Sequence, residues 1–392
     1  MLKQTLAVTG MNLKALPQRL GTSSVIIVGI AGVVAVLVSV LAMVVGFRAT
    51  MENTGRDDRA LVLRGGSQAE INSSLSREDA QTILDTAGLR RDAQGEAIAC
   101  PEVVVIISMK TLADASDANV TLRGTCDKLA ALRPEFKLVA GRMYAPAVRE
   151  LIVGQSAAQQ FDNLAIGDEI EFRDSSWTVV GHFSTGGDNH ESELLADNET
   201  VLSAYRRNGY QSLTAMLESP AQFTAFKDAL TTNPTLKVDA RTEPQYYAQQ
   251  SEQLTKVLNF LAYFVGGIMA IGAMFGALNT MYTAVSSRSV EIATLRALGF
   301  SSMPVVMSVI VEAVVLALIG GLIGSALAWL FFNGNAVSTL GGNFSQVVFR
   351  LTVSGGLIVT GITWACAIGL IGGLFPAIRA ARLPIAEALR AH

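Results

Sequence analysis

Four long apolar segments constrain the fold of this chain more than any other feature of its sequence. Residues 25–47, 257–286 and 351–378 contain no charged side chain, and residues 304–332 contain only Glu312. The shortest of these segments would form a helix about 34 Å long, whereas a bilayer core is about 30 Å thick. We therefore predict an α-helical membrane protein with four transmembrane helices. The first segment exceeds the apolar region of a cleaved signal peptide, so we expect it to remain as a span.

A large polar region, residues 48–256, separates the first span from the second. It holds 21 Lys and Arg against 30 Asp and Glu. Runs of β-branched residues bounded by Gly, Asp or Ser predict strands, and two capped segments predict helices. The predicted strands are residues 60–63, 103–109, 120–123, 151–154, 169–173, 178–183, 212–217 and 236–241, and the predicted helices are residues 76–84 and 219–230. We therefore expect a large mixed α+β domain.

The end of this domain is predicted to continue into the membrane without a break. From Gln245 the chain contains neither Gly nor Pro until Gly266, and both the polar residues to Lys256 and the following apolar residues are compatible with a helix. We expect residues 245–256 to form a rigid stalk.

Basic residues around the spans predict their orientation. The amphipathic N-terminal segment 1–24 carries three Lys or Arg, the loop 287–303 carries two and the tail 379–392 carries three, whereas the short loop 333–350 carries only Arg350. Because basic flanks stay on the cytoplasmic side, we expect both termini and the loop 287–303 to be cytoplasmic. The acidic domain and the loop 333–350 would then lie outside.

The cysteines are consistent with an external domain. Cys100 and Cys126 both lie in the polar region, where an oxidising compartment would permit a disulfide, and Cys366 lies in the fourth span. Sequence alone does not give the separation of the two α-carbons, so two free thiols are the alternative.

The sequence offers little catalytic chemistry. His182 and His190 lie near Asp188, Glu191 and Glu193, but the spacing fits no compact metal site and favours a solvated loop. The chain has no Gly-x-Ser-x-Gly, no His-Glu-x-x-His and no P-loop. Its basic residues are scattered, so nucleic acid is not an expected partner. We expect a non-enzymatic chain that holds no cofactor of its own.

Two features of the spans invite a structural or functional interpretation. Gly272/Gly276, Gly320/Gly324 and Gly369/Gly373 are pairs at Gly-x-x-x-Gly spacing, which permits close helix packing. Glu312 would lie about 12 Å into the third span. An acid at that depth suggests a functional site, and the alternative is a structural Glu that snorkels or bonds Ser or Thr near the inner interface.

The loop 287–303 is predicted to contain a short amphipathic helix that stops at Gly299. Arg288 and Glu291 are neighbours at i and i+3, and Val290, Ala293, Thr294 and Leu298 line another face. This helix is either a turn at the membrane surface or a docking element for a cytoplasmic partner.

The motif Arg-x-x-Glu-Ile-x-x-Leu-Arg-Ala-Leu-Gly in this loop resembles the cytoplasmic signature of FtsX-, MacB- and LolC/LolE-like permeases of type VII ABC transporters. Residues 312–324 and 375–390 resemble the family's third span and C-terminal tail, and residues 55–67 and 180–197 are similar to the MacB-like periplasmic core. Two departures are Ala293, where many members have Gly, and the lack of a fused ATPase domain.

The resemblance implies that a separate, dimeric ATP-binding subunit binds ATP and Mg and docks on the loop helix. The implied coupling residues are Arg288, Glu291, Ile292, Leu295, Arg296, Ala297, Leu298 and Gly299. It further implies a second permease copy or paralogue, membrane lipids, porter-like and Sabre-like subdomains, and a location in the bacterial inner membrane with a periplasmic domain.

Two functions follow from this resemblance. The first is a permease that couples ATP hydrolysis to motion of the periplasmic domain, either for efflux with a periplasmic adaptor and an outer-membrane channel or for extraction of lipoprotein or lipid. The alternative is an FtsX-like signalling permease that regulates a cell-wall hydrolase, although FtsX itself has a smaller outer domain.

Overall fold

The computed structural model describes residues 2–15, 20–382 and 384, so most of the predicted C-terminal tail lies outside the described residues. The chain divides into two compact units. The helical unit comprises Met1–Val45, Lys256–Asn335 and Leu351–His392. The sheet unit comprises Gly46–Thr255 and Ala336–Arg350.

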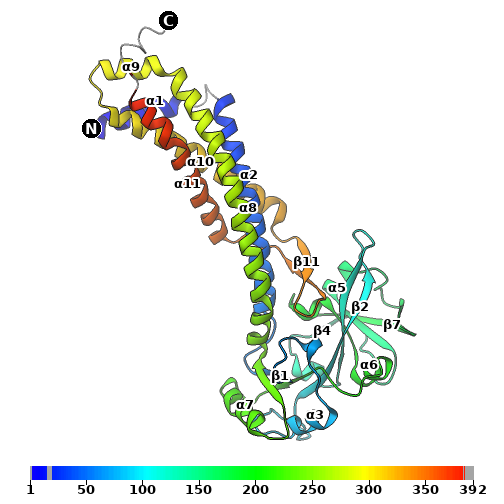
Figure 1. Ribbon diagram of the computed structural model, residues 1–392. Helices are drawn as coiled ribbons and strands as arrows, with labels where there is room; N and C mark the ends of the chain where they lie inside the picture. Colours follow the sequence, from blue (N-terminus) through cyan, green and yellow to red (C-terminus); the bar gives the residue numbers. More distant parts are fainter. Residues whose placement is uncertain (1, 16–19, 383, 385–392) are drawn as a thin grey trace. The chain divides into compact units, whose positions relative to one another are not determined.

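Long helices dominate the helical unit (Figure 1). They are α1 (Leu2–Ala15), α2 (Leu20–Glu52), α8 (Glu243–Ser287), α9 (Ser289–Ala297), α10 (Ser302–Phe332) and α11 (Gly355–Ala381). Four of them, α2, α8, α10 and α11, are long and apolar enough to cross a membrane. The helices α2, α8 and α10 begin before their predicted spans, and α8 includes the whole predicted stalk in one 45-residue helix. The predicted start of the fourth span is wrong, because α11 begins at Gly355 and Leu351 instead bonds Gly334 and Asn335.

Two of the three Gly-x-x-x-Gly pairs lie at close helix contacts. A Cβ on Gly324 would lie 2.4 Å from the carbonyl oxygen of Ala31 in α2, and a Cβ on Gly369 would lie 2.4 Å from the Cβ of Ala317 in α10. Any larger residue would push these helices apart. Gly272 and Gly276 differ, because no described atom lies within 4 Å of a Cβ built there.

The sheet unit is the predicted mixed α+β domain. Its strands are β1 (Arg59–Arg64), β2 (Ala99–Lys110), β3 (Asp117–Thr125), β4 (Lys137–Gly141), β5 (Glu150–Gly154), β6 (Glu169–Phe172), β7 (Ser175–Ser184), β8 (Glu193–Asp197), β9 (Ser212–Met216), β10 (Val238–Thr242), β11 (Ala336–Leu340) and β12 (Gln346–Arg350). Its helices are η2 (Glu70–Asn72), α3 (Arg77–Leu84), α4 (Leu129–Leu132), α5 (Gln155–Gln160), η3 (Asn189–Ser192), α6 (Asn198–Ala204), η4 (Pro220–Gln222) and α7 (Phe223–Thr232).

The long strand β2 joins two halves of one sheet, whose order is β10-β1-β9-β2-β3-β8-β5-β7-β4, with β6 paired to β7. The first residues of β2, Ala99–Glu102, pair with β9, and the rest, from Val103, pair with β3. A disulfide between Cys100 and Cys126, with α-carbons 5.5 Å apart, ties the start of β2 to the residue that follows β3. The strand and the disulfide therefore hold the two halves together.

The predicted loop 333–350 has more structure than its sequence suggested. Residues 336–350 form the antiparallel hairpin β11–β12, which belongs to the sheet unit although it lies between α10 and α11 in the chain. Val347 and Phe349 are buried there.

Candidate functional site

The helix α9 forms where the loop helix was predicted, and Gly299 ends it with a positive φ of 94°. The signature residues divide between two faces. Arg288, Ile292 and Ala293 are buried against the helical unit, whereas Glu291 and Leu298 are exposed. Leu295 and Arg296 lie between these extremes, and Ala297 is exposed. The helix therefore presents only part of its signature outward.

Arg288 occupies a different place from the one expected. It directly follows α8, and its guanidinium points into the helical unit, where Nη1 donates to Glu312 Oε2 at 2.8 Å. Nη2 donates to Asn12 Oδ1 of α1, and Nε lies 3.6 Å from the carboxylate of Glu291. Because Arg288 is only 6% exposed, it holds α1, α9 and α10 together rather than presenting its charge on the surface.

This ion pair gives Glu312 a partner that the sequence did not predict. The Glu312 side chain is buried, and its Oε2 accepts from Arg288 Nη1 at 2.8 Å. A buried carboxylate in an apolar helix is costly unless it is paired, and Arg288 supplies that partner. The signal in the sequence was the presence of one isolated acid in the third span and one arginine at the end of the second.

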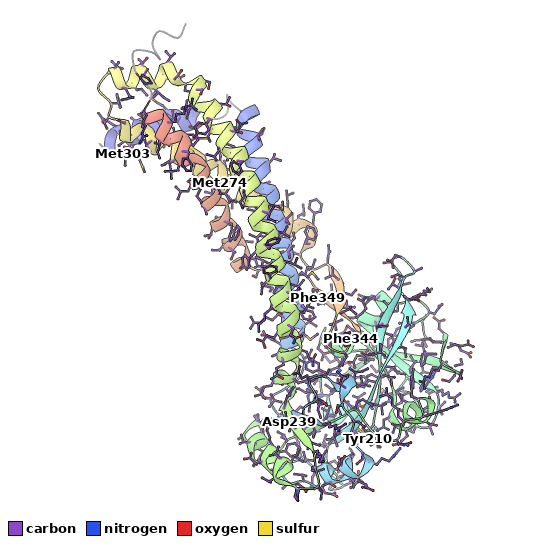
Figure 2. The ribbon with its side chains drawn as sticks, viewed as in Figure 1. Tyr210, Asp239, Met274, Met303, Phe344 and Phe349 are labelled. Atoms are coloured by element: carbon purple, nitrogen blue, oxygen red, sulfur yellow. A yellow bond between two sulfur atoms is a disulfide. The ribbon has the colours of Figure 1, made fainter. Side chains whose placement is uncertain are left out.

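The exposed face of α9 is apolar at its C-terminal end. Leu298 is 73% exposed, and Met303, at the start of α10, is 57% exposed (Figure 2). Thr294 and Glu291 lie about one and two turns before Leu298, respectively, and are also exposed. These four residues, which we call the α9 face, combine an apolar end with polar groups, as protein interfaces commonly do.

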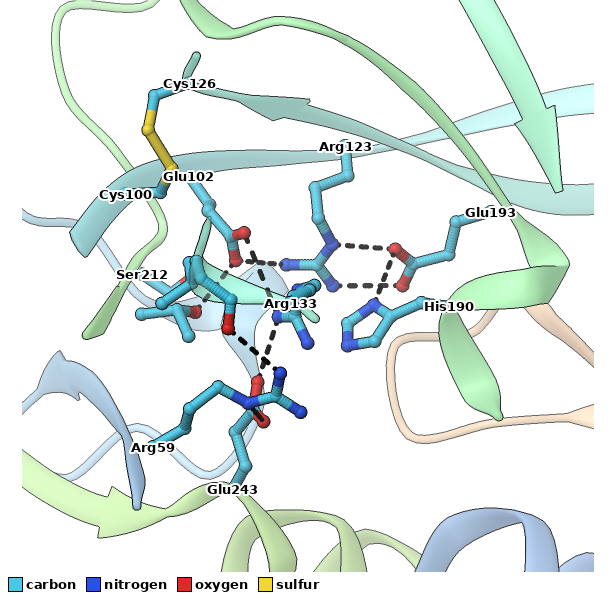
Figure 3. Close-up of polar contacts among 12 residues, drawn as sticks. Arg59, Cys100, Glu102, Arg123, Cys126, Arg133, His190, Glu193, Ser212 and Glu243 are labelled. Carbon is cyan, nitrogen blue, oxygen red and sulfur yellow. Dashed lines mark hydrogen bonds and ion pairs between the residues drawn. A yellow bond between two sulfur atoms is a disulfide. The ribbon is translucent and has the colours of Figure 1, made fainter. Parts of the chain in front are cut away.

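A second polar site lies inside the sheet unit, centred on Arg123 of β3 (Figure 3). Arg123 Nη1 lies 2.7 Å from Glu70 and 2.9 Å from Glu102. Its Nη2 donates to Glu70 and Glu193, and its Nε donates to Glu193 at 2.7 Å. All five N–H groups of the guanidinium are therefore used. We call these four residues the Arg123 network.

Further charges connect the first turn of α8 to the same region. Glu243, the first residue of α8, accepts from Arg59 Nε of β1 at 2.5 Å and lies 2.9 Å from Arg133 Nη2. Tyr246 accepts a hydrogen bond from the backbone N–H of Glu70 through its hydroxyl. Because Glu243, Tyr246 and Tyr247 are spaced i, i+3 and i+4, all three lie on one face of the helix. The start of α8 is thus anchored in the sheet.

The predicted solvated loop around His190 is wrong. Asp188, His190, Glu191 and Glu193 are all buried. His190 Nδ1 lies 3.1 Å from Glu193, and its Nε2 lies 3.1 Å from the hydroxyl of Tyr247. Gly186 and Gly187, both with positive φ, form the turn that precedes these buried residues. His182 lies apart and bonds the carbonyl oxygen of Leu164.

Arg123 lowers the pKa of two acids of the network, Glu70 and Glu193. Burial alone would raise the pKa of Glu193, but Arg123 and then His190 lower that pKa well below its usual range. The pKa of Glu70 is likewise lowered, because Arg123 outweighs burial. Asp188 differs, because burial raises its pKa more than its polar neighbours lower it. Glu70 and Glu193 are thus held as carboxylates near neutral pH.

The contacts of this site are those of a buried ion-pair network. Among the described residues, no group of three or more His, Cys, Asp or Glu is arranged to hold a metal ion. The sequence analysis named Glu193 but missed Glu70, Glu102 and Arg123. One signal was available, because Glu102 and Arg123 are charged residues beside the β-branched runs of β2 and β3.

Comparison with known proteins agrees with this organisation. Residues 23–233 match the MacB-like periplasmic core domain, and residues 263–385 match the FtsX-like permease C-terminal domain. An uncharacterized ABC transporter permease of Methanocaldococcus jannaschii is 26% identical over 250 residues, which cover 61% of each chain. The macrolide export ATP-binding/permease protein MacB of Bdellovibrio bacteriovorus is 21% identical over 94% of this chain and 59% of its own.

The chain spans about three fifths of the length of these two relatives. A solved structure, the extracellular domain of the ABC-type transporter YknZ from Gram-positive bacteria, aligns with 47% of this chain and 100% of that one, at 16% identity and a TM-score of 0.36. The two family matches together cover most of the chain. They include residues of all four apolar helices and most of the sheet unit. The chain therefore belongs to the FtsX- and MacB-like permeases of type VII ABC transporters.

Proposed function

We propose that this chain is the membrane permease subunit of an ABC transporter in which a separate ATP-binding subunit hydrolyses ATP. Hydrolysis would move the periplasmic domain and drive export or extraction of a substrate from the periplasm or the outer leaflet. The chain would contribute no catalytic residue, and ATP and Mg would be bound by the partner subunit.

One observation carries the proposal: a single helix, α8, joins the two polar sites. Its first residue, Glu243, is held by Arg59 and Arg133 within the sheet unit. Its last residue is followed at once by Arg288, which pairs with Glu312 in the helical unit. An uninterrupted helix of 45 residues is about 67 Å long. Such a helix can transmit a displacement of the α9 face to the sheet.

The α9 face is the proposed docking surface for the ATP-binding subunit. Leu298 and Met303 would supply the apolar anchor, and Glu291 would set orientation, because buried apolar groups dominate most interfaces while charges select the partner. Arg288 would act indirectly, by holding α9 against α1 and α10. The N and C termini would lie in the cytoplasm of a cell with an inner membrane.

Other partners follow from the same proposal. A second copy of the chain, or a paralogue, would complete the permease, and membrane lipids would surround the spans. A periplasmic adaptor and an outer-membrane channel would be needed for efflux across a second membrane but not for extraction of lipoprotein or lipid. The two halves of the sheet joined by β2 are candidates for the porter-like and Sabre-like subdomains.

The test is the substitution Leu298→Asp. Because Leu298 is 73% exposed, the change leaves the fold intact. A charge in a desolvated contact should reduce retention of the ATP-binding subunit at least tenfold, which corresponds to about 1.4 kcal/mol. The measurement is the amount of ATP-binding subunit that co-purifies per permease at equal membrane abundance.

Leu112→Asp is the matched control, since Leu112 is 55% exposed in the sheet unit. It should leave retention unchanged. Equal retention in wild type, Leu298→Asp and Leu112→Asp would remove the docking role of the α9 face.

A further inference from the structure

The hairpin β11–β12 is part of the sheet unit and packs against its other elements. Phe349 of β12 packs edge-on against Phe47 at the end of α2, with ring centroids 5.5 Å apart. A Cβ on Gly46 would lie 2.1 Å from the carbonyl oxygen of Arg350, so the two backbones approach as closely as glycine allows. Figure 2 shows Phe344 and Phe349 on this hairpin. The hairpin is therefore docked on the sheet unit rather than free.

The tip of the hairpin contacts the strand that carries Arg123. The hydroxyl of Thr121 donates to Ser345 Oγ at 2.8 Å, and Asn119 Nδ2 donates to the carbonyl oxygen of Phe344 at 3.0 Å. Thr121 and Arg123 lie on the same strand, two residues apart, with their side chains on the same side of it. The tip is thus seated beside the Arg123 network.

Two further hydrogen bonds reach the network from the hairpin. Asn343 Nδ2 lies 3.4 Å from Glu70 Oε2, the carboxylate that Arg123 also holds. The backbone N–H of Val348 donates to Ser192 Oγ, which directly precedes Glu193. The hairpin therefore contacts Glu70 itself and residues adjacent to Arg123 and Glu193.

The legs of the hairpin are stiff. Beyond β11 and β12, the N–H of Gly334 donates to the carbonyl oxygen of Leu351, and the N–H of Leu351 donates to that of Asn335. The N–H of Val353 donates to the side chain of Asn333, the residue after the end of α10. Pairing therefore continues almost to the ends of α10 and α11, and a displacement of these helices would be passed to the hairpin.

The seat of the tip is weaker than the attachment of α8. It consists of hydrogen bonds between neutral groups and one long contact to a carboxylate, whereas Glu243 of α8 is held by two arginines. Hydrogen bonds between ionised groups are stronger than those between neutral groups. Phe344 is also strained, because an aromatic residue there has a φ of 60° while its ring is 65% exposed. A weak, strained contact suits an element that separates and returns.

We propose that the β11–β12 hairpin is a second coupling element, which leaves its seat beside the Arg123 network and returns to it once in each transport cycle. It would link α10 and α11 to the network, in parallel with the permanent attachment through α8. This inference rests on the proposed function, because it assigns a role within the same coupling mechanism.

A reversible disulfide tests the proposal. The hydroxyl oxygens of Thr121 and Ser345 are 2.8 Å apart, so Thr121→Cys with Ser345→Cys places two sulfurs within reach of a bond. The pair is made in a Cys366→Ser background, so that the natural free cysteine of the described chain does not compete. The probe is the rate of ATP hydrolysis by the complex of permease and ATP-binding subunit in lipid nanodiscs.

Oxidation should lower that rate at least tenfold, and mild reductant should restore it. The reductant should spare the native Cys100–Cys126 disulfide, because Cys100 is completely buried. Two controls should show no change on oxidation. They are the single Thr121→Cys and Ser345→Cys variants, and the pair Leu340→Cys with Gln346→Cys, which joins the two strands of the hairpin to each other at a paired position.

The outcomes separate the two proposals. A full rate in the oxidised, fully cross-linked pair would overturn the hairpin inference and leave the proposed function intact. The proposed function itself would be contradicted if neither the wild type nor the folded, reduced double variant retained an ATP-binding subunit. Arrest by the Leu340–Gln346 cross-link as well would show that hairpin flexibility, and not its release, is required, and would also overturn the inference.

Discussion

The two buried charge sites of this protein are built differently. In the sheet unit, Arg123 uses all five of its N–H groups on three carboxylates, which come from η2, β2 and β8. In the helical unit, Arg288 has one buried carboxylate, Glu312, together with the amide oxygen of Asn12. The first site joins several elements of the sheet, whereas the second joins the N-terminus of α9 to side chains of α1 and α10.

The two sites therefore differ in how many carboxylates must be removed before the central arginine loses its buried partners. Removing any one carboxylate from Arg123 leaves two others, so the site holds the sheet in one arrangement. Among the residues that the structure describes, Glu312 is the only buried carboxylate paired with Arg288, so the helical site depends on a single buried pair. We expect the first site to act as a rigid anchor for α8 and the second as the place where neighbouring helices can shift.

Loss of the guanidinium at the centre of the network should have the largest effect. Arg123→Met leaves three buried carboxylates without their common partner and should lower the free energy of unfolding of the sheet unit by about 5 kcal/mol. The measurement is urea unfolding of the full-length protein in detergent, with protease resistance as the readout of the folded fraction. Arg77→Ala is the control, since the Arg77–Glu199 pair is 54% and 52% exposed and should cost below about 1 kcal/mol. Equal losses in both variants would contradict a special role for burial.

The helical pair should respond differently to single and double substitution. Arg288→Met or Glu312→Met alone leaves one buried charge unpaired, and each should cost about 3 kcal/mol. The double variant removes both charges and should regain most of that loss, because two apolar side chains suit an apolar helix contact. Thermal aggregation of the four proteins in detergent provides the comparison. A double variant as unstable as either single one would show that the pair does more than neutralise charge.

Acid should weaken the sheet unit but only below the ordinary range of carboxylates. Because Arg123 outweighs burial and lowers the pKa of both Glu70 and Glu193 in the folded state, their contribution is complete above the unfolded value of about 4.3 and is lost as pH falls below it. Below that pH, each of these two carboxylates should lower the free energy of unfolding by at most about 1.4 kcal/mol per pH unit. Asp188, whose pKa burial raises, works in the opposite direction and makes the loss smaller.

Fluorescence of Trp177, which is buried in the sheet unit, reports this loss when Trp329 and Trp364 are replaced by Phe. Glu193→Gln should be less stable at pH 7 and should lose less between pH 5 and pH 3 than the parent protein. Parallel acid curves for the two proteins would show that Glu193 does not contribute to the acid response.

Part of this organisation was predictable from the sequence because it depends on local properties. Long charge-free runs identify spans whatever their neighbours are, and β-branched runs identified most strands of the sheet. Strands β4 and β8 and the hairpin were missed. All five residues of β4 are exposed, and β8 begins at the buried Glu193, so neither shows the alternation expected of a half-buried strand.

The partners of the buried charges depend on tertiary structure. Local sequence patterns were enough to predict four spans, a polar domain between the first two, a continuous helix through residues 245–256 and a short helix ending at Gly299. They could not assign Arg288 to Glu312, Arg123 to Glu70, or the hairpin tip to Thr121, because each pair is 24 to 224 residues apart and forms only when distant segments meet. An arginine is equally suited to a surface and to a buried carboxylate, and burial alone distinguishes the two.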